Sequence, residues 1–225
     1  YLLLALMSKE SSTLLLALAP IALYVFNRDT IKKTIIQSIP AFVLIALYTL
    51  FRLSISEMPV GKTDIMNDPY LYATIEQKYA TILLILGKYL SLLILPLTQC
   101  IDYGYNQIPY VELSNSNTLI SLVVYVGLLI IGIYSIIKRQ PIGFFVISYL
   151  LSIVLLSNAL VNVGPPMADR FLFAPSLFFI GFLLILIHAI SDKINTTAFS
   201  YGSKIMLLAF IIFSFIKVYS RNQDW

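Results

Sequence analysis

Three short segments hold the residues of this chain that could bind or transform a substrate. In the first, ADRFLFAPS at 168–176, Asp169 and Arg170 stand directly before an apolar run. A guanidinium offers paired donors that match the oxygens of a phosphate, so Arg170 is a candidate phosphate ligand. A charge at the edge of a membrane span can equally be an anchor whose stem lies along lipid. The sequence leaves both alternatives open.

The second segment is DYGYNQIP at 102–109, which contains Asp102, Tyr103 and Tyr105. The carboxylate can accept a hydrogen bond from a sugar hydroxyl, and tyrosine rings can stack on the apolar face of a sugar. Tyrosines also gather at membrane–water interfaces without any ligand. A membrane belt is therefore the alternative to a binding wall.

The third segment is Ser8-Lys9-Glu10, which lies between two apolar runs. Ionisable residues in such a place are candidates for function, although a short turn between helices explains them nearly as well. With Arg170 as the phosphate ligand, the predicted pocket residues are Lys9, Glu10, Asp102, Tyr103, Tyr105 and Asp169.

The elements that must position these residues are apolar helices. Hydrophobic residues make up 59% of the 225 and charged residues only 12%, against roughly 25% charged in soluble domains. Long apolar runs between short polar clusters indicate an all-α, polytopic transmembrane bundle rather than a barrel. Six full spans are predicted, at 12–26, 35–51, 118–137, 142–161, 171–190 and 203–219. A truncated helix at 1–7 precedes them, and we expect one domain, 1–225, cut from a longer protein at both ends.

The lone Cys100 and the lone His188 predict neither an intrachain disulfide nor a metal site. The sequence contains no phosphate-binding glycine loop or dinucleotide motif, so no cofactor is predicted. The net charge of +4 comes from short clusters beside apolar runs. Such clusters are typical of cytoplasmic loops, and they do not indicate a nucleic-acid partner.

The same clusters predict the topology. When Arg28, Lys138-Arg139 and Lys193 are placed in the cytoplasm, the loops at 52–78, 97–117 and 162–170 all face outward. The apolar segment 79–96 then begins and ends on the outer side, so we expect it to be re-entrant or interfacial. Irregular backbone at that depth is tolerated only against protein or a watery cavity. An outer cavity under two long loops follows.

Four stretches, taken in order, resemble one family: MSKE at 7–10, YLSLLILPLTQCIDYGYNQIP at 89–109, ADRFLFAPS at 168–176 and RNQDW at 221–225. They are similar to the GT-C glycosyltransferases, above all to the transmembrane-and-tetratricopeptide-repeat O-mannosyltransferases and their bacterial relatives. The likeness covers nearly the whole chain, and ADRFLFAPS is its most specific part. The chain departs from the family pattern with Asp169 for Glu, Phe171 and Phe173 for Tyr, and Gly104 for Ser.

The resemblance implies a multi-pass enzyme of a bacterial inner membrane. Such an enzyme moves a mannose-like sugar from a polyprenyl-phosphate donor to an acceptor, a protein Ser/Thr or a glycan, on the non-cytoplasmic side. It implies that Arg170 stabilises the departing phosphate, that the catalytic carboxylate precedes Tyr1, and that tetratricopeptide repeats follow Trp225. Besides donor and acceptor, the expected partners are membrane lipids.

Other functions remain as alternatives. A lipid-linked oligosaccharide ligase or polymerase shares large outer loops with arginine and acids. A transporter would carry ionisable residues near the membrane midplane and show inverted repeats, whereas the polar residues here gather at the outer rim. That distribution favours an enzyme acting at the membrane face, and a scaffold that only anchors repeats is the third alternative.

The topology predicts a labelling pattern. In a Cys100→Ser background, single cysteines at Gly61 and Val163 are expected to react with an impermeant thiol reagent from the same side of the membrane, because both lie in loops predicted to face outward. Labelling of these two positions from opposite sides contradicts the scheme.

Overall fold

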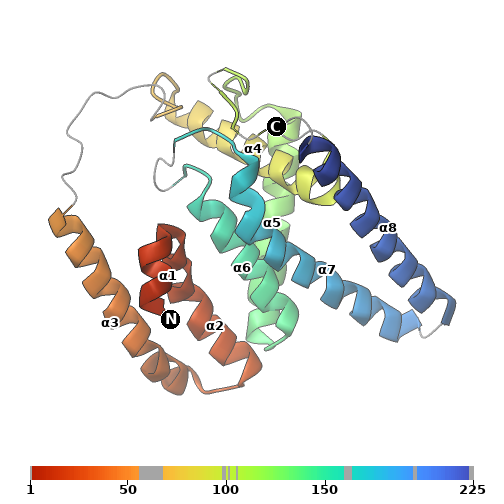
Figure 1. Ribbon diagram of the computed structural model, residues 1–225, viewed down its shortest axis with the longest axis horizontal. Coiled ribbons are helices and arrows are strands. Elements are labelled where there is room, and N and C mark those ends of the chain that lie inside the picture. Colours follow the sequence, from red (N-terminus) through yellow and green to blue (C-terminus); the bar gives the residue numbers. More distant parts are fainter. Residues whose placement is uncertain are drawn as a thin grey trace.

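The computed structural model describes residues 2–55, 68–97, 100, 102–104, 106–159, 164–194 and 197–222, and within these ranges it forms helices and no strands (Figure 1). The all-α prediction is therefore confirmed for this part of the chain. The elements are α1 (Leu2–Ser8), η1 (Glu10–Leu14), α2 (Leu15–Phe26), α3 (Ile31–Ile55), α4 (Ile75–Ile94), α5 (Ser116–Ile137), α6 (Pro141–Leu155), η2 (Asp169–Leu172), α7 (Phe173–Ile194) and α8 (Thr197–Asn222).

Five helical stretches in the described ranges are long and apolar enough to cross a membrane: Ile31–Arg52, Ile75–Ile94, Ser116–Ile137, Asp169–Ile194 and Tyr201–Ser220. The chain is therefore a multi-pass membrane protein. The predicted number of six full spans is not confirmed. Two of the predicted spans form shorter apolar helices, Ser12–Phe26 and Pro141–Leu155. A helix needs about 20 residues to cross roughly 30 Å of hydrocarbon, so neither of them counts as a full span.

The core lies among α4, α5, α6 and α7, where Ile85, Tyr89 and Ile153 are completely buried. Close approach of the helices depends on glycine. A Cβ atom at Gly143 in α6 would lie 2.6 Å from the backbone nitrogen of Ile136 in α5. Since that obstacle is backbone, it cannot move aside, and only glycine fits the position.

One polar contact joins three helices inside this core. The Tyr125 hydroxyl of α5 donates to the Leu86 carbonyl of α4 at 2.9 Å and lies 2.7 Å from the Tyr149 hydroxyl of α6. Because the Tyr125 proton is used on Leu86, Tyr149 is the donor in the second bond. Both hydroxyls are thereby satisfied away from water, as buried polar groups require.

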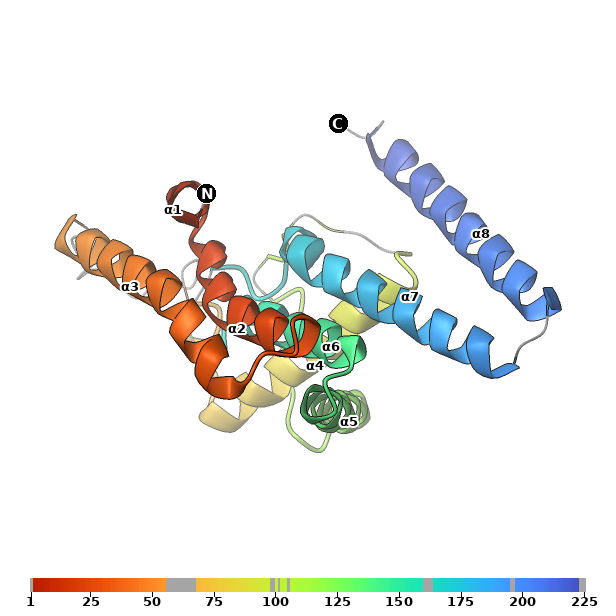
Figure 2. The ribbon, with the colours of Figure 1, turned by 90° about the horizontal axis from the view of Figure 1, so that it is seen from below.

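Helix α4 supplies Ile85 and Tyr89 to this core. It runs obliquely across α5 (Figure 1), and Figure 2 looks along α5 while showing α4 from the side. The helix is unbroken from Ile75 to Ile94, with a capping box at Thr74 and Gln77. That 79–96 is re-entrant or interfacial stays a prediction, because α4 is also long enough to span.

The loops separate to two ends of the bundle. At one end the Arg139 guanidinium donates to the Arg28 carbonyl at 2.5 Å and lies 4.5 Å from the Tyr24 ring centroid, joining the α2–α3 and α5–α6 turns. At the other end the segments before α4, α5 and α7 meet, as the contacts described below establish. This grouping agrees with the predicted topology; positions Gly61 and Val163 lie outside the described residues.

If α4 lies at the interface, both of its ends face the same side of the membrane. Cysteines at Glu76, before its first full turn, and at Leu97, just beyond its last, are expected to label from the outer side in a Cys100→Ser background. A cysteine at Gln140, in the α5–α6 turn, is the control and should label from the other side. All three positions are exposed. Labelling of Glu76→Cys and Leu97→Cys from opposite sides, with Glu76→Cys on the side of Gln140→Cys, would make α4 a full span.

Candidate functional site

The candidate site lies where three segments meet at the loop end of the bundle. The Tyr103 amide donates to the Met167 carbonyl at 3.0 Å, and the Asp169 amide donates to the Cys100 carbonyl at 3.3 Å. These bonds hold the segment after α4 beside the segment before α7. The Tyr110 hydroxyl donates to the Pro69 carbonyl at 2.7 Å and adds the segment before α4.

Two hydrogen bonds from Tyr89 of α4 hold the segment before α7 in place. Its hydroxyl donates to the Ala168 carbonyl at 3.2 Å and accepts from the Ala168 amide at 2.9 Å. Tyr89 and Ala168 are both completely buried, so water cannot replace either bond. A second buried side chain, Asn158, donates its Nδ2 to the Pro165 carbonyl at 3.0 Å. The course of 164–168 is thus set by two side chains from the helical core.

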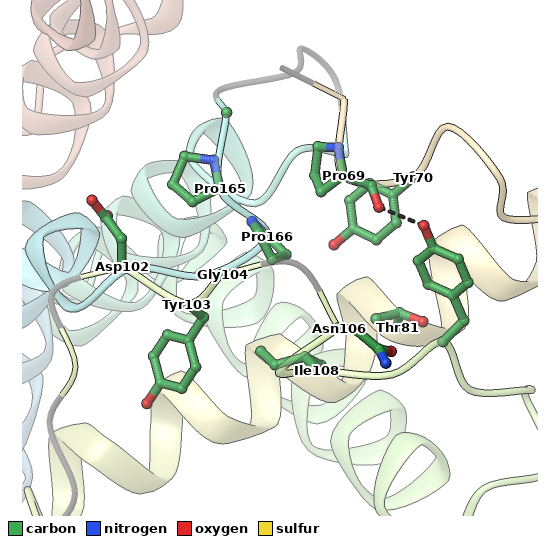
Figure 3. Close-up of a pocket in the computed structure, with 12 residues that line it drawn as sticks. Pro69, Tyr70, Thr81, Asp102, Tyr103, Gly104, Asn106, Ile108, Pro165 and Pro166 are labelled. Carbon is green, nitrogen blue, oxygen red and sulfur yellow. Dashed lines mark hydrogen bonds between the residues drawn. The ribbon is translucent and has the colours of Figure 1, made fainter. Parts of the chain in front are cut away.

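A cavity of about 350 Å³ lies among the three segments. Tyrosine rings and proline rings make up much of its wall (Figure 3). The lining residues are Pro69, Tyr70, Thr81, Asp102, Tyr103, Gly104, Asn106, Ile108, Tyr110, Gly164, Pro165 and Pro166. This volume is within the range of small-molecule sites.

Tyr70 gives the cavity a polar point. The side chain is 5% exposed, and its hydroxyl points into the cavity (Figure 3) with no hydrogen-bond partner among the described residues. Burial raises the pKa of this hydroxyl, so it stays protonated at neutral pH and can donate. A buried hydroxyl without a partner is costly, and a bound ligand with an acceptor would remove that cost.

A carboxylate that pairs with a guanidinium lies on the opposite side of the cavity. Asp102 lines the cavity on the side away from Tyr70 (Figure 3), and its Oδ1 lies 3.2 Å from an η nitrogen of Arg170. The side chains are 41% and 58% exposed, respectively. Because an exposed pair of this kind contributes little to stability, its charges remain able to bind a ligand.

Asp169 lies in the segment directly before α7. It is the first residue of η2, and its Oδ2 accepts from the Cys100 amide at 2.6 Å. It does not belong to the cavity lining. The carboxylate therefore ties two segments together, beside the Asp169 amide that binds the Cys100 carbonyl.

The other predicted residues fall into two groups. Asp102 and Tyr103 line the cavity, and their role as pocket residues stays a prediction. Lys9 is exposed at the start of η1, and no described hydrogen bond or ion pair joins its side chain to Asp102 or Arg170. The side chain of Glu10 and all of Tyr105 lie outside the described residues.

Sequence reasoning missed Tyr70, Tyr110 and the proline pair Pro165-Pro166 as cavity residues. The first lies in NDPY, which reads as a turn signal, and the pair lies in GPP, which reads the same way. The available signal was the aromatic residue directly after Pro69.

No protein-family model, curated protein or solved structure matches the chain.

The Tyr89 contact makes a stability prediction. Tyr89→Phe keeps the ring but leaves the buried Ala168 amide without its acceptor, so the free energy of unfolding should fall by about 1–3 kcal/mol. The measurement is thermal unfolding of the purified protein in detergent. Tyr134→Phe, at an exposed tyrosine of α5, is the matched control and should change little. Equal midpoints for the two variants would show that the Tyr89 hydroxyl does not hold the loop.

Proposed function

We propose that this chain is part of a bacterial inner-membrane glycosyltransferase. It transfers a mannose-like sugar from a polyprenyl-phosphate donor to an acceptor hydroxyl, on a protein Ser/Thr or a glycan, at the non-cytoplasmic face. One observation carries the proposal: Asp102, which lines a tyrosine-rich cavity at the loop end of a membrane bundle, forms an ion pair with Arg170.

The cavity wall suits a sugar unit. Its rings and prolines offer flat apolar surface for the C–H face of a pyranose, and a hydroxyl of the sugar can accept from Tyr70. The Asp102 carboxylate can accept from another hydroxyl across the cavity. A volume of about 350 Å³ accommodates one such unit with part of its neighbour.

Arg170 suits the phosphate. In the transfer, the bond between the sugar C1 and the donor phosphate oxygen breaks, and a bond from C1 to the acceptor oxygen forms. The acceptor proton leaves to a base, and the negative charge of the leaving group grows on the lipid phosphate. A guanidinium beside that oxygen stabilises the growing charge. Asp102, at 3.2 Å, keeps Arg170 turned toward the cavity rim until the phosphate binds.

The placement of charge supports an enzyme over a transporter. In the described part of the chain, the ion pairs lie at helix ends or loops: Lys33 with Asp29, His188 with Asp192, and Arg170 with Asp102. A transporter would be expected to pair charges near the middle of its spans.

The phosphate role of Arg170 predicts a loss of turnover. Arg170→Ala should lower sugar transfer by roughly 100- to 1,000-fold, equivalent to about 2.7–4 kcal/mol, because the lost donor acts mainly on the leaving charge. Arg170→Lys should restore activity only in part, since an ammonium cannot make the paired contact. The measurement is transfer from a polyprenyl-phosphate sugar by the full-length protein.

Two controls accompany this test. Lys193→Ala removes an exposed cation from the end of α7 and should leave transfer unchanged, and monodispersity in detergent verifies folding. A well-folded Arg170→Ala with full activity would falsify the phosphate role. Full activity of Arg170→Lys would instead indicate a membrane anchor, because lysine snorkels as well as arginine.

A further inference from the structure

A second, polar cavity lies between α4 and α5. It is about 300 Å³ in volume, and five polar side chains line it: Lys88 and Ser91 from α4, and Asn117, Ser121 and Tyr125 from α5. Asn117 and Ser121 belong to the first turns of α5, which begins at the loop end of the bundle. This α4–α5 groove therefore opens near one edge of the membrane.

Lys88 is the unusual member of the α4–α5 groove. It lies inside a 20-residue apolar helix, and among the described residues no carboxylate forms an ion pair with it. An ammonium in such a helix must pair with an anion or reach water. The Ser91 hydroxyl donates to the Lys88 carbonyl at 2.7 Å, and the Ser121 hydroxyl donates to the Asn117 carbonyl at 2.9 Å. The donors left for a ligand are the Lys88 ammonium and the Asn117 amide.

A large apolar cavity adjoins the α4–α5 groove. It has a volume of about 850 Å³ and lies among α4, α5, α6, α7 and α8. Leu90 and Val124 line both spaces, so the two lie side by side. Of its described lining residues, only Tyr149 carries a polar atom, and that hydroxyl is bonded to Tyr125. The cavity therefore offers no partner to a polar ligand.

We infer that the groove and the apolar cavity together bind one anionic membrane phospholipid. Its phosphate contacts Lys88 and Asn117, and an acyl chain fills the cavity between α4 and α8. The charge of the groove selects the phosphate, and the apolar cavity beside it, across Leu90 and Val124, receives the acyl chain. A zwitterionic lipid binds less well, because its own ammonium competes with Lys88. Arg170 has no part in this site, and the inference does not rest on the proposed function.

The test uses native mass spectrometry of the purified full-length protein with phosphatidylglycerol and phosphatidylcholine of identical chains. Phosphatidylglycerol should bind more tightly. Lys88→Gln should weaken its binding roughly tenfold, the equivalent of one charge-assisted contact, and should leave phosphatidylcholine unchanged. Lys88→Arg should keep the preference. Lys193→Gln, which removes an exposed charge outside the groove, should not change it.

A second variant tests the part of the proposed site that receives the acyl chain. Leu128→Trp fills the apolar cavity from α5 and should weaken both lipids. Unchanged binding in Leu128→Trp, or equal phosphatidylglycerol affinity in the wild type and Lys88→Gln, overturns the inference. If Lys88→Gln does not fold, Asn117→Leu takes its place, and an unchanged lipid preference there counts equally against it.

One outcome would assign the site to another lipid. Polyprenyl phosphate that displaces phosphatidylglycerol from the wild type, together with loss of sugar transfer in Lys88→Gln, would make this the donor site and overturn the phospholipid assignment. Failure of the Arg170 proposal is distinguishable, because activity of Arg170→Ala leaves the lipid preference untouched.

Discussion

The Tyr89 hydroxyl binds both backbone groups of Ala168, at 3.2 and 2.9 Å, in a place without access to water. An unpaired amide and carbonyl there would each cost free energy on the order of 1–3 kcal/mol. The chain between Gly164 and Arg170 follows the course that lets one phenol satisfy both groups. The cavity wall at Pro165-Pro166 and the guanidinium at its rim therefore depend on a side chain that touches neither.

Tyr89 belongs to α4, and this helix holds more than one of the loop segments in place. Thr81 accepts from the Val111 amide at 3.1 Å near one end of α4, and Tyr89 holds Ala168 near the other. Segments distant in the sequence thus rest on one oblique helix. The loops need no sheet or disulfide to keep their shape, because hydrogen bonds from a rigid helix anchor them.

The sequence predicted the helical class and the two segments that supply Asp102 and Arg170, since composition and charged residues are visible without a structure. It could not predict their pairing, because no local pattern encodes a contact over 68 positions.

The length of the span at 142–161 was overestimated because it too depends on a non-local contact. Helix α6 ends at Leu155, and Asn158, with φ 60°, binds the Pro165 carbonyl. Asp169 was assigned to the pocket from its neighbours, whereas its carboxylate lies against Cys100. Adjacency in sequence does not determine which way a side chain points.

The hydrogen bonds of the Tyr125 hydroxyl with Leu86 and Tyr149 fix how α4, α5 and α6 are aligned along their axes. If α5 slid by one turn, about 5.4 Å, the hydroxyls of Tyr125 and Tyr149 would lose these partners inside an apolar core. Apolar side chains alone tolerate such slippage, because one leucine contact resembles the next. The position of α4 along α5 and α6, and with it the place of the loops that α4 holds, is consequently set by two buried tyrosines.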